Sequence, residues 1–165
     1  MISQEDMKAI FLPLLHKQGS IFIKKQKIWA KPAEEGEVVI TVTNDGMETS
    51  NIANFGDMLI KNQTIANEMY VMSEQSFQQR YANMEDPVLD NDGFQEFLPI
   101  GKINALLIDS QLLIKLNLPD EFYFQAPWQS KMICKKNDFL ACPPDFSQVY
   151  RIAHKEFFET YTRIK

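Results

Sequence analysis

The spacing of hydrophobic residues predicts a short amphipathic helix at the N-terminus. Between Met7 and Leu15 the apolar residues recur at helical intervals, and Ser3 stands before them as a typical helix cap. Pro13 predicts a kink in this helix or its end near Leu12, because proline lacks the amide hydrogen that a helix interior needs. Gly19 then predicts the stop of the helix.

After this helix, short runs of β-branched and aromatic residues separated by turn residues predict mostly strands. The clearest run, 38–43, is followed by Asn44-Asp45-Gly46 and by a return run at 47–52, a pattern that favours a hairpin. Further strands are predicted at 21–29, 58–61, 69–72, 103–108, 112–116, 121–124, 131–134, 139–142 and 149–152. The runs 131–134 and 139–142 predict a second hairpin around Asn137-Asp138.

Two stretches of the chain repeat the same residue types at nearly the same intervals. The first copy consists of Asp57, Tyr70, Phe77 and Tyr81, and the second consists of Asp138, Tyr150, Phe157 and Tyr161. The Tyr-to-Phe interval is seven residues in both copies, the Phe-to-Tyr interval is four, and the Asp-to-Tyr interval is 13 against 12. In the first copy the predicted helix runs from a Ser73 cap to about residue 83. Such matched offsets indicate an approximate internal duplication, in which each unit buries its apolar face against a neighbour.

The predicted fold class is therefore α+β. Two tandem strand-rich units, each closed by a C-terminal helix, follow the short N-terminal helix. The predicted segments are the N-terminal helix at 1–19, a first unit at 20–84, an acidic linker at 85–96, and a second unit at 97–165 packed on the first. The second unit lacks the hairpin of the first, which is the main difference between the copies.

Composition narrows the class of protein. The 165 residues are 45% hydrophobic and 24% charged, as in ordinary globular domains. The net charge of −5 argues against a nucleic-acid-binding surface, which needs an excess of Lys and Arg. The lack of a long apolar run and of a basic, cleavable leader argues against a membrane protein and predicts cytoplasmic localisation. The basic runs at 24–27 and 135–136 are interpreted as solvated strand edges.

Cys134 and Cys142 could face each other across the second predicted hairpin. Cysteines in a chain without an export signal are more often buried thiols than a disulfide. We therefore expect both cysteines to be reduced.

The residues around the two repeated aspartates resemble a protein family. The first copy reads Asn54-Phe55-Gly56-Asp57-Met58-Leu59, and the second reads Lys136-Asn137-Asp138-Phe139-Leu140. With the Tyr-bearing strand and the Phe–Tyr helix that follow, this order is similar to the bacterial and phage group called PGDYG proteins. Both copies lack the family's Pro, and Asn137 stands where the first copy has Gly56, a mild change because Asn also adopts the left-handed conformation. The resemblance implies a compact β-rich fold with a closing helix, and it implies no reaction.

Asp57 and Asp138 are the candidate catalytic residues, because both copies share them and each follows a tight turn. In one interpretation each carboxylate accepts backbone amides of its own turn. In the other, the two carboxylates converge in a cleft as acid and base. A matched Asp and Tyr in each copy would also form a latch that joins turn, strand and helix.

The candidate ligand-binding residues are Trp29, Lys31, Tyr70, Trp128 and Tyr150. Trp29 and Trp128 each stand close to a proline at a strand end, and tryptophan is enriched at recognition sites. A ligand site is expected between these two residues and the turn at 44–46. For Tyr70 and Tyr150 the alternative to ligand binding is a place in the hydrophobic core, and the core is the favoured interpretation.

Metal sites and cofactors are not predicted. The acidic run Asp90-Asn91-Asp92-Gly93 lacks the ligand spacing and the closing Glu of a calcium-binding loop.

These observations favour a non-enzymatic binding or accessory module for a small molecule or a protein. The hairpin at 38–52 and the tryptophan-bearing strand ends would form its recognition surface. The alternative is a small enzyme that acts on a nucleotide-like or other polar small molecule through the paired aspartates. A symmetric homodimer is compatible with both.

Overall fold

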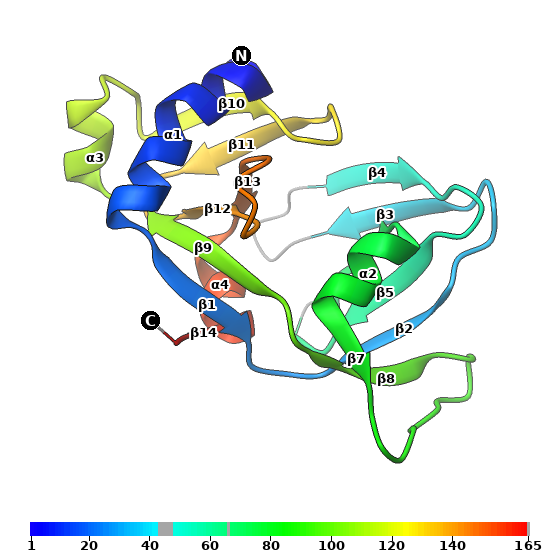
Figure 1. Ribbon diagram of the computed structural model, residues 1–165. Helices are drawn as coiled ribbons and strands as arrows, with labels where there is room; N and C mark the ends of the chain where they lie inside the picture. The colour runs from blue at the N-terminus through cyan, green and yellow to red at the C-terminus, as the bar shows by residue number, and fades with distance from the viewer. Residues whose placement is uncertain (43–47, 66, 165) are drawn as a thin grey trace. The chain divides into compact units, whose positions relative to one another are not determined.

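The computed structural model describes residues 1–42, 48–65 and 67–164, and these form an α+β protein that begins with a helix (Figure 1). The predicted fold class is therefore confirmed. The predicted turn at 44–46 lies outside the described residues. The chain divides into two compact units. Unit 1 combines Met1–Ile23 with the chain from Lys102 onwards, and unit 2 is Lys24–Gly101.

Unit 2 is built on a five-stranded antiparallel sheet with the order β6-β5-β2-β8-β7. Its elements are β2 (Ile28–Pro32), β3 (Val38–Val42), β4 (Glu48–Ile52), β5 (Met58–Asn62), β6 (Met69–Met72), α2 (Glu74–Arg80), β7 (Tyr81–Asn83) and β8 (Gln95–Pro99). On one face of the sheet, Phe77 of α2 packs with Ile28 and Ile60. On the other face, Val39 of the hairpin β3–β4 packs with Leu59. The sheet therefore lies between a helix and a hairpin.

Unit 1 has a five-stranded antiparallel sheet with the order β13-β12-β9-β1-β14. Its elements are α1 (Gln4–Gln18), β1 (Ser20–Lys24), β9 (Lys102–Leu107), α3 (Ser110–Lys115), β10 (Glu121–Gln125), β11 (Lys131–Lys135), β12 (Phe139–Cys142), β13 (Tyr150–Ile152), α4 (His154–Thr160) and β14 (Tyr161–Arg163). Phe157 of α4 packs on Phe139, with ring centroids 3.7 Å apart. A separate core joins α1 to β10, where Phe11 stacks on Phe122. Here too a closing helix and a hairpin accompany the sheet.

The two five-stranded sheets have the same strand order, and the strands that come directly before β2 and before β9 in the chain are exchanged between the sheets. The strands β2, β5, β6 and β7 correspond in order to β9, β12, β13 and β14. The remaining strand of unit 2 is β8, which pairs with β2, although β8 comes directly before β9 in the chain. The remaining strand of unit 1 is β1, which pairs with β9, although β1 comes directly before β2. We call this arrangement the strand exchange, and it supports the predicted duplication.

The strand exchange explains why the compact units differ from the predicted segments. The predicted strand at 21–29 is two strands, β1 and β2, that belong to different sheets. The predicted acidic linker at 85–96 ends inside β8. The predicted helix after Ser73 ends at Arg80, where the chain passes into β7. The packing of a second unit on a first stays a prediction.

The helix α1 continues through Pro13 to Gln18 and is capped by Gly19, so the predicted stop at Gly19 is confirmed and the alternative end near Leu12 is wrong. Pro13 is exposed, whereas Phe11 and Leu15 on either side of it are completely buried. A proline in a helix interior costs about 3 kcal/mol or more. Burial of two large apolar side chains contributes about 1.5–3 kcal/mol each, which offsets that loss. Packing therefore decides the length of this helix.

The run 112–116, predicted as a strand, is part of the helix α3. The Asp109 carboxylate accepts a hydrogen bond from the Leu112 amide at 2.9 Å and caps the helix. Leu112 and Leu113 are buried, so adjacent apolar residues on one side of a short helix resembled a buried strand.

The predicted hairpin between 131–134 and 139–142 is also wrong. β11 pairs with β10, whereas β12 pairs with β9 and β13. The turn between β11 and β12 is real, and Asn137 has a φ of 73°, close to the 87° of Gly56 in the corresponding turn. Asn137 thus supplies the left-handed conformation that Gly56 supplies in unit 2.

Cys134 and Cys142 are free, buried thiols, as expected. Burial raises the pKa of both thiols above the ordinary value of 9.0, to about 12 for Cys142. The negative charge of Asp138 raises the pKa of Cys134 further.

We expect both thiols to resist a disulfide reagent in the native protein. A rise in pKa from 9.0 to about 12 lowers the thiolate fraction of Cys142 at pH 8 roughly 10³-fold. Titration should detect no fast thiol under native conditions and two after unfolding in guanidinium chloride. Because these folded pKa values lie above the unfolded one, the thiols stabilise the fold below pH 9, and this contribution falls as the pH rises towards 12. A thiol that reacts fully within minutes before unfolding would contradict this expectation.

Candidate functional site

Asp57 and Asp138, the candidate catalytic residues, each end a tight turn, before β5 and before β12. Asp57 accepts a hydrogen bond from the Asn54 amide at 2.9 Å. Asp138 accepts one from the Lys135 amide at 2.8 Å. Both bonds close the residue's own turn, as the first interpretation of these carboxylates predicts. Because the two residues belong to different compact units, their convergence in one cleft stays a prediction.

Asp138 makes further contacts inside unit 1. Its Oδ2 accepts from Arg151 Nε at 2.9 Å, and its Oδ1 accepts from the His154 amide at 3.0 Å. The Asp138 side chain is 5% exposed and the Arg151 side chain 3%. A buried carboxylate needs such compensation. Both oxygens are therefore engaged in holding a turn, β13 and α4 together, which favours a structural role over acid–base chemistry.

The hydroxyls of Tyr70 and Tyr81 meet at the ammonium group of Lys24. Lys24 Nζ donates to the Tyr70 hydroxyl at 2.7 Å, to the Tyr81 hydroxyl at 2.5 Å and to Asn62 Oδ1 at 3.2 Å. These acceptors match the three donors of an ammonium group. The interpretation of Lys24 as a solvated strand-edge residue is therefore wrong. In the predicted latch, the hydroxyls of Tyr70 and Tyr81 bond to Asp57. In the structure both hydroxyls accept from Lys24 instead.

The hydrogen-bond network continues from Asn62 to Glu68. Asn62 Nδ2 donates to Glu68 Oε2 at 2.7 Å, and the Thr64 hydroxyl donates to Glu68 Oε1 at 2.7 Å. Both Asn62 and Glu68 are buried. Satisfied buried polar groups of this kind fix the positions of the elements that carry them. The network therefore ties Lys24 to β5 and to the loop before β6.

Trp29 and Lys31 are neighbours on the hairpin side of β2. Trp29 is half-buried and packs against the cluster of Val39, Leu59 and Phe94. Lys31 Nζ lies 4.4 Å from the centroid of the Phe94 ring and donates to a backbone carbonyl at 3.0 Å. The structure brings these two predicted ligand-binding residues to one side of β2, where both contact the apolar cluster between the sheet and the hairpin β3–β4.

Trp128 and Tyr150, the remaining predicted ligand-binding residues, belong to unit 1. Trp128 lies in the turn between β10 and β11 and is 42% exposed. Tyr150 is on β13, where it packs with the cluster around Phe157. Because Trp29 is in unit 2, a site shared by Trp29 and Trp128 stays a prediction.

The acidic run 90–93 forms a turn around Asp90. Asp90 Oδ1 accepts from the amides of Asp92 and Phe94, both at 2.9 Å, and Oδ2 lies 3.5 Å from Lys61 Nζ. Burial acts to raise the pKa of Asp90, but these hydrogen bonds and Lys61 outweigh it and hold the pKa below its ordinary value. Across residues 1–42, 48–65 and 67–164, we find no cluster of three or more His, Cys, Asp or Glu side chains suited to a metal ion.

The hairpin β3–β4 presents apolar side chains to solvent on its outer face. Along β3, Val38, Ile40 and Val42 are 59%, 53% and 47% exposed, whereas Val39 between them is buried. On β4, Ile52 pairs with Val38 and is 65% exposed. We call these four residues the hairpin stripe. Strand alternation normally puts polar residues on the solvent side, so the hairpin stripe is an exception that points to an interaction surface.

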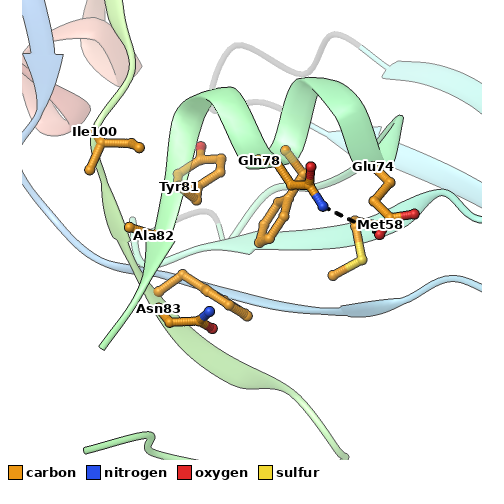
Figure 2. Close-up of a pocket in the computed structure, with 9 residues that line it drawn as sticks. Met58, Glu74, Gln78, Tyr81, Ala82, Asn83 and Ile100 are labelled. Atoms are coloured by element: carbon orange, nitrogen blue, oxygen red, sulfur yellow. Dashed lines mark hydrogen bonds between the residues drawn. The ribbon is translucent and has the colours of Figure 1, made fainter. Parts of the chain in front are cut away.

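A pocket of about 410 Å³ lies beside α2 in unit 2 (Figure 2). Its apolar walls are formed by Met58, Phe77, Tyr81 and Phe97. The Phe77 ring meets that of Phe97 edge to face at 4.9 Å and that of Tyr81 at 5.3 Å. The volume falls within the usual range of small-molecule sites.

Sequence reasoning missed both the Lys24 network and the pocket. The run of lysines at 24–27 gave no sign that one of them would bond to two tyrosines that follow it at long distance in the chain. The spacing of Phe77 and Tyr81 is the sequence signal that accompanies the pocket, but this spacing by itself indicates core packing. Both residues are indeed buried, and they also form pocket walls.

Comparison of the chain with protein-family models, with curated proteins and with solved structures gives no match. The resemblance to PGDYG proteins stays a prediction. Among the described residues, the helices are all too short or too polar to cross a lipid bilayer.

Proposed function

We propose that this chain is a cytoplasmic, non-enzymatic binding module, and that the hairpin stripe is where it holds a partner protein. The observation that carries the proposal is the exposure of Val38, Ile40, Val42 and Ile52 on one face of a hairpin whose other face is packed. The two buried, free thiols support a reducing compartment. Contiguous exposed apolar surface of this kind typically marks a protein–protein contact.

The charges beside the hairpin stripe indicate the chemistry of the partner. Glu34 and Glu35 are exposed just before β3, and Glu37 adjoins Val38. A partner that matches this surface carries apolar side chains flanked by Lys or Arg, because complementary charges steer association. A second copy of this chain would set the same glutamates against one another if the two hairpins met in parallel. The acidic end of the stripe therefore favours a basic partner segment.

The contacts of the two aspartates support a binding function over the enzymatic alternative. Asp138 is buried and engaged by Arg151 and by backbone amides, and Asp57 closes its own turn. Acid–base catalysis needs a carboxylate within reach of a substrate proton. Neither aspartate lines the pocket beside α2.

We expect a short peptide of alternating valine and lysine to bind the hairpin stripe with a dissociation constant below about 1 mM. Chemical shifts of backbone amides in an isotope-labelled sample would report the site, and the largest shifts should lie in β3 and β4. A peptide of alternating valine and glutamate should bind much more weakly, because it faces Glu34 and Glu35. Ile40→Lys should abolish binding of the lysine peptide.

The matched control is Ile114→Lys on α3, which replaces an even more exposed isoleucine, 78% against 53%. This control should leave peptide binding unchanged. Equal binding of the two peptides, or shifts centred outside β3 and β4, would contradict the proposal. A self-associating chain that Ile40→Lys converts to a monomer would assign the surface to a second copy instead.

A further inference from the structure

Among the described residues that line the pocket beside α2, aromatic side chains form the walls and Glu74 alone is charged. Figure 2 shows Glu74 at one end of the pocket, beside Met58, and Asn83 at the other. Gln78 lies between Glu74 and Tyr81, and its Nε2 donates to Glu74 Oε1 at 3.5 Å. The lining contains no Lys, Arg or His among the residues that the structure describes. The polar side-chain groups of its lining are therefore one carboxylate, two carboxamides and the Tyr81 hydroxyl, and that hydroxyl accepts a hydrogen bond from Lys24.

We infer that this pocket binds an organic cation, namely an ammonium group on an apolar body. Aromatic faces attract cations through the negative charge of their ring faces, and a neighbouring carboxylate adds direct attraction. The Phe77 and Phe97 rings, perpendicular to one another at an interplanar angle of 89°, suit an alkyl or aryl body of the ligand. A carboxylate ligand would instead meet Glu74 without a compensating cation in the pocket lining.

The position of Lys24 decides which end of the pocket takes the charge. The Lys24 ammonium bonds to the Tyr81 hydroxyl and therefore repels a second cation near Tyr81. Figure 2 shows Glu74 on the far side of Gln78 from Tyr81. The ligand's ammonium group thus lies at the Glu74 end, and its apolar body lies towards Tyr81 and Ala82.

Titration with phenethylamine tests this inference. We expect saturable binding, seen as amide shifts in α2 and β7, with a dissociation constant of about 1 mM or tighter. Phenylpropionate, of similar size but negative charge, should bind at least about tenfold more weakly, because Glu74 repels it. Nα-acetyl-lysinamide, which carries the side chain of a lysine within a protein, is the second compound titrated. Tighter binding of phenethylamine would assign the pocket to a small-molecule amine, and tighter binding of the lysine derivative would assign it to a lysine side chain of a protein.

Two variants locate the site. Glu74 is exposed, so Glu74→Gln should leave the fold intact. It should weaken phenethylamine binding about fivefold. Ala82→Leu should fill the apolar end and weaken binding further. Glu121→Gln, at an exposed glutamate on β10 that lies outside both the pocket and the hairpin stripe, is the matched control and should have no effect. Equal binding of phenethylamine and phenylpropionate, the absence of binding at millimolar concentration, or full affinity in Glu74→Gln would overturn the inference. These readouts lie in α2 and β7, so they are independent of the hairpin stripe.

Discussion

Cutting the chain in the exposed segment 85–87 should leave a single folded complex rather than two separate fragments. The fragment before the cut carries β1, which lies between β9 and β14 in the sheet of unit 1. The fragment after the cut carries β8, which lies between β2 and β7 in the sheet of unit 2. Separation of the fragments therefore requires the loss of a strand from inside both sheets at once.

The test inserts a protease site at 85–87 in the purified chain. After cleavage, a denaturing gel should show two fragments, whereas gel filtration under native conditions should show a single species near the 19.2 kDa of the intact chain. The same sample in urea should give two separated fragments, which is the control for complete cutting. Fragments that part under native conditions would disprove the strand exchange.

The second large effect concerns Asp138, for which Asp57 provides a matched control within the same chain. Asp138→Ala removes one charge of a buried ion pair with Arg151 and three hydrogen bonds, including two from backbone amides. Breaking a buried pair in this way typically costs about 3–5 kcal/mol of unfolding free energy. Asp57→Ala removes a hydrogen bond from a partly exposed turn and should cost about 1 kcal/mol.

Urea unfolding of the two variants and of the parent measures the difference. Since a domain of ordinary stability has only about 5–15 kcal/mol in total, Asp138→Ala brings the fold close to its limit. Asp138→Asn is a milder variant that keeps an oxygen acceptor, and it should fall between the parent and Asp138→Ala. Equal losses for Asp57→Ala and Asp138→Ala would refute the structural role assigned to Asp138.

Local patterns in the sequence predicted elements whose hydrogen bonds are local. The hairpin at 38–52 follows from a β-branched run and a turn sequence, and β3 and β4 pair as expected. The Asp57 and Asp138 turns follow from the preference of aspartate for its own backbone amides. The first-copy helix follows from the Ser73 cap, which accepts from the Ser76 amide.

The errors arise where distant residues decide the structure. The run 131–142 contains two strands around a turn, but β12 pairs with β9, and no residue within the run indicates that choice. Likewise, α1 extends beyond Pro13 because Phe11 and Leu15 enter a core completed by residues such as Phe122. The run 112–116 is apolar enough for a strand or a helix, and its Asp109 cap is the local signal that favours a helix.

In the candidate sites, too, the sequence indicates local features but not the features that depend on distant residues. The residue types of the hairpin stripe are visible in the sequence, but their exposure is not, because alternation does not say which face is packed. The pocket beside α2 needs Glu74 and Phe97 to be brought together by the fold. The role of Lys24 depends on Tyr70 and Tyr81, which follow it by 46 and 57 residues.

The strand exchange has a consequence for synthesis on the ribosome. The sheet that contains β2 lacks β8 until residues 95–99 have left the exit tunnel, although its other strands are made earlier. The strand β1 is made before both of its partners, β9 and β14, and stays unpaired until they emerge. Pairing over such long sequence separations is slow and leaves unpaired edges exposed in the meantime. In a nascent chain, both edges of β1 and the edge of β2 that meets β8 therefore stay open to wrong pairing until those later strands are made.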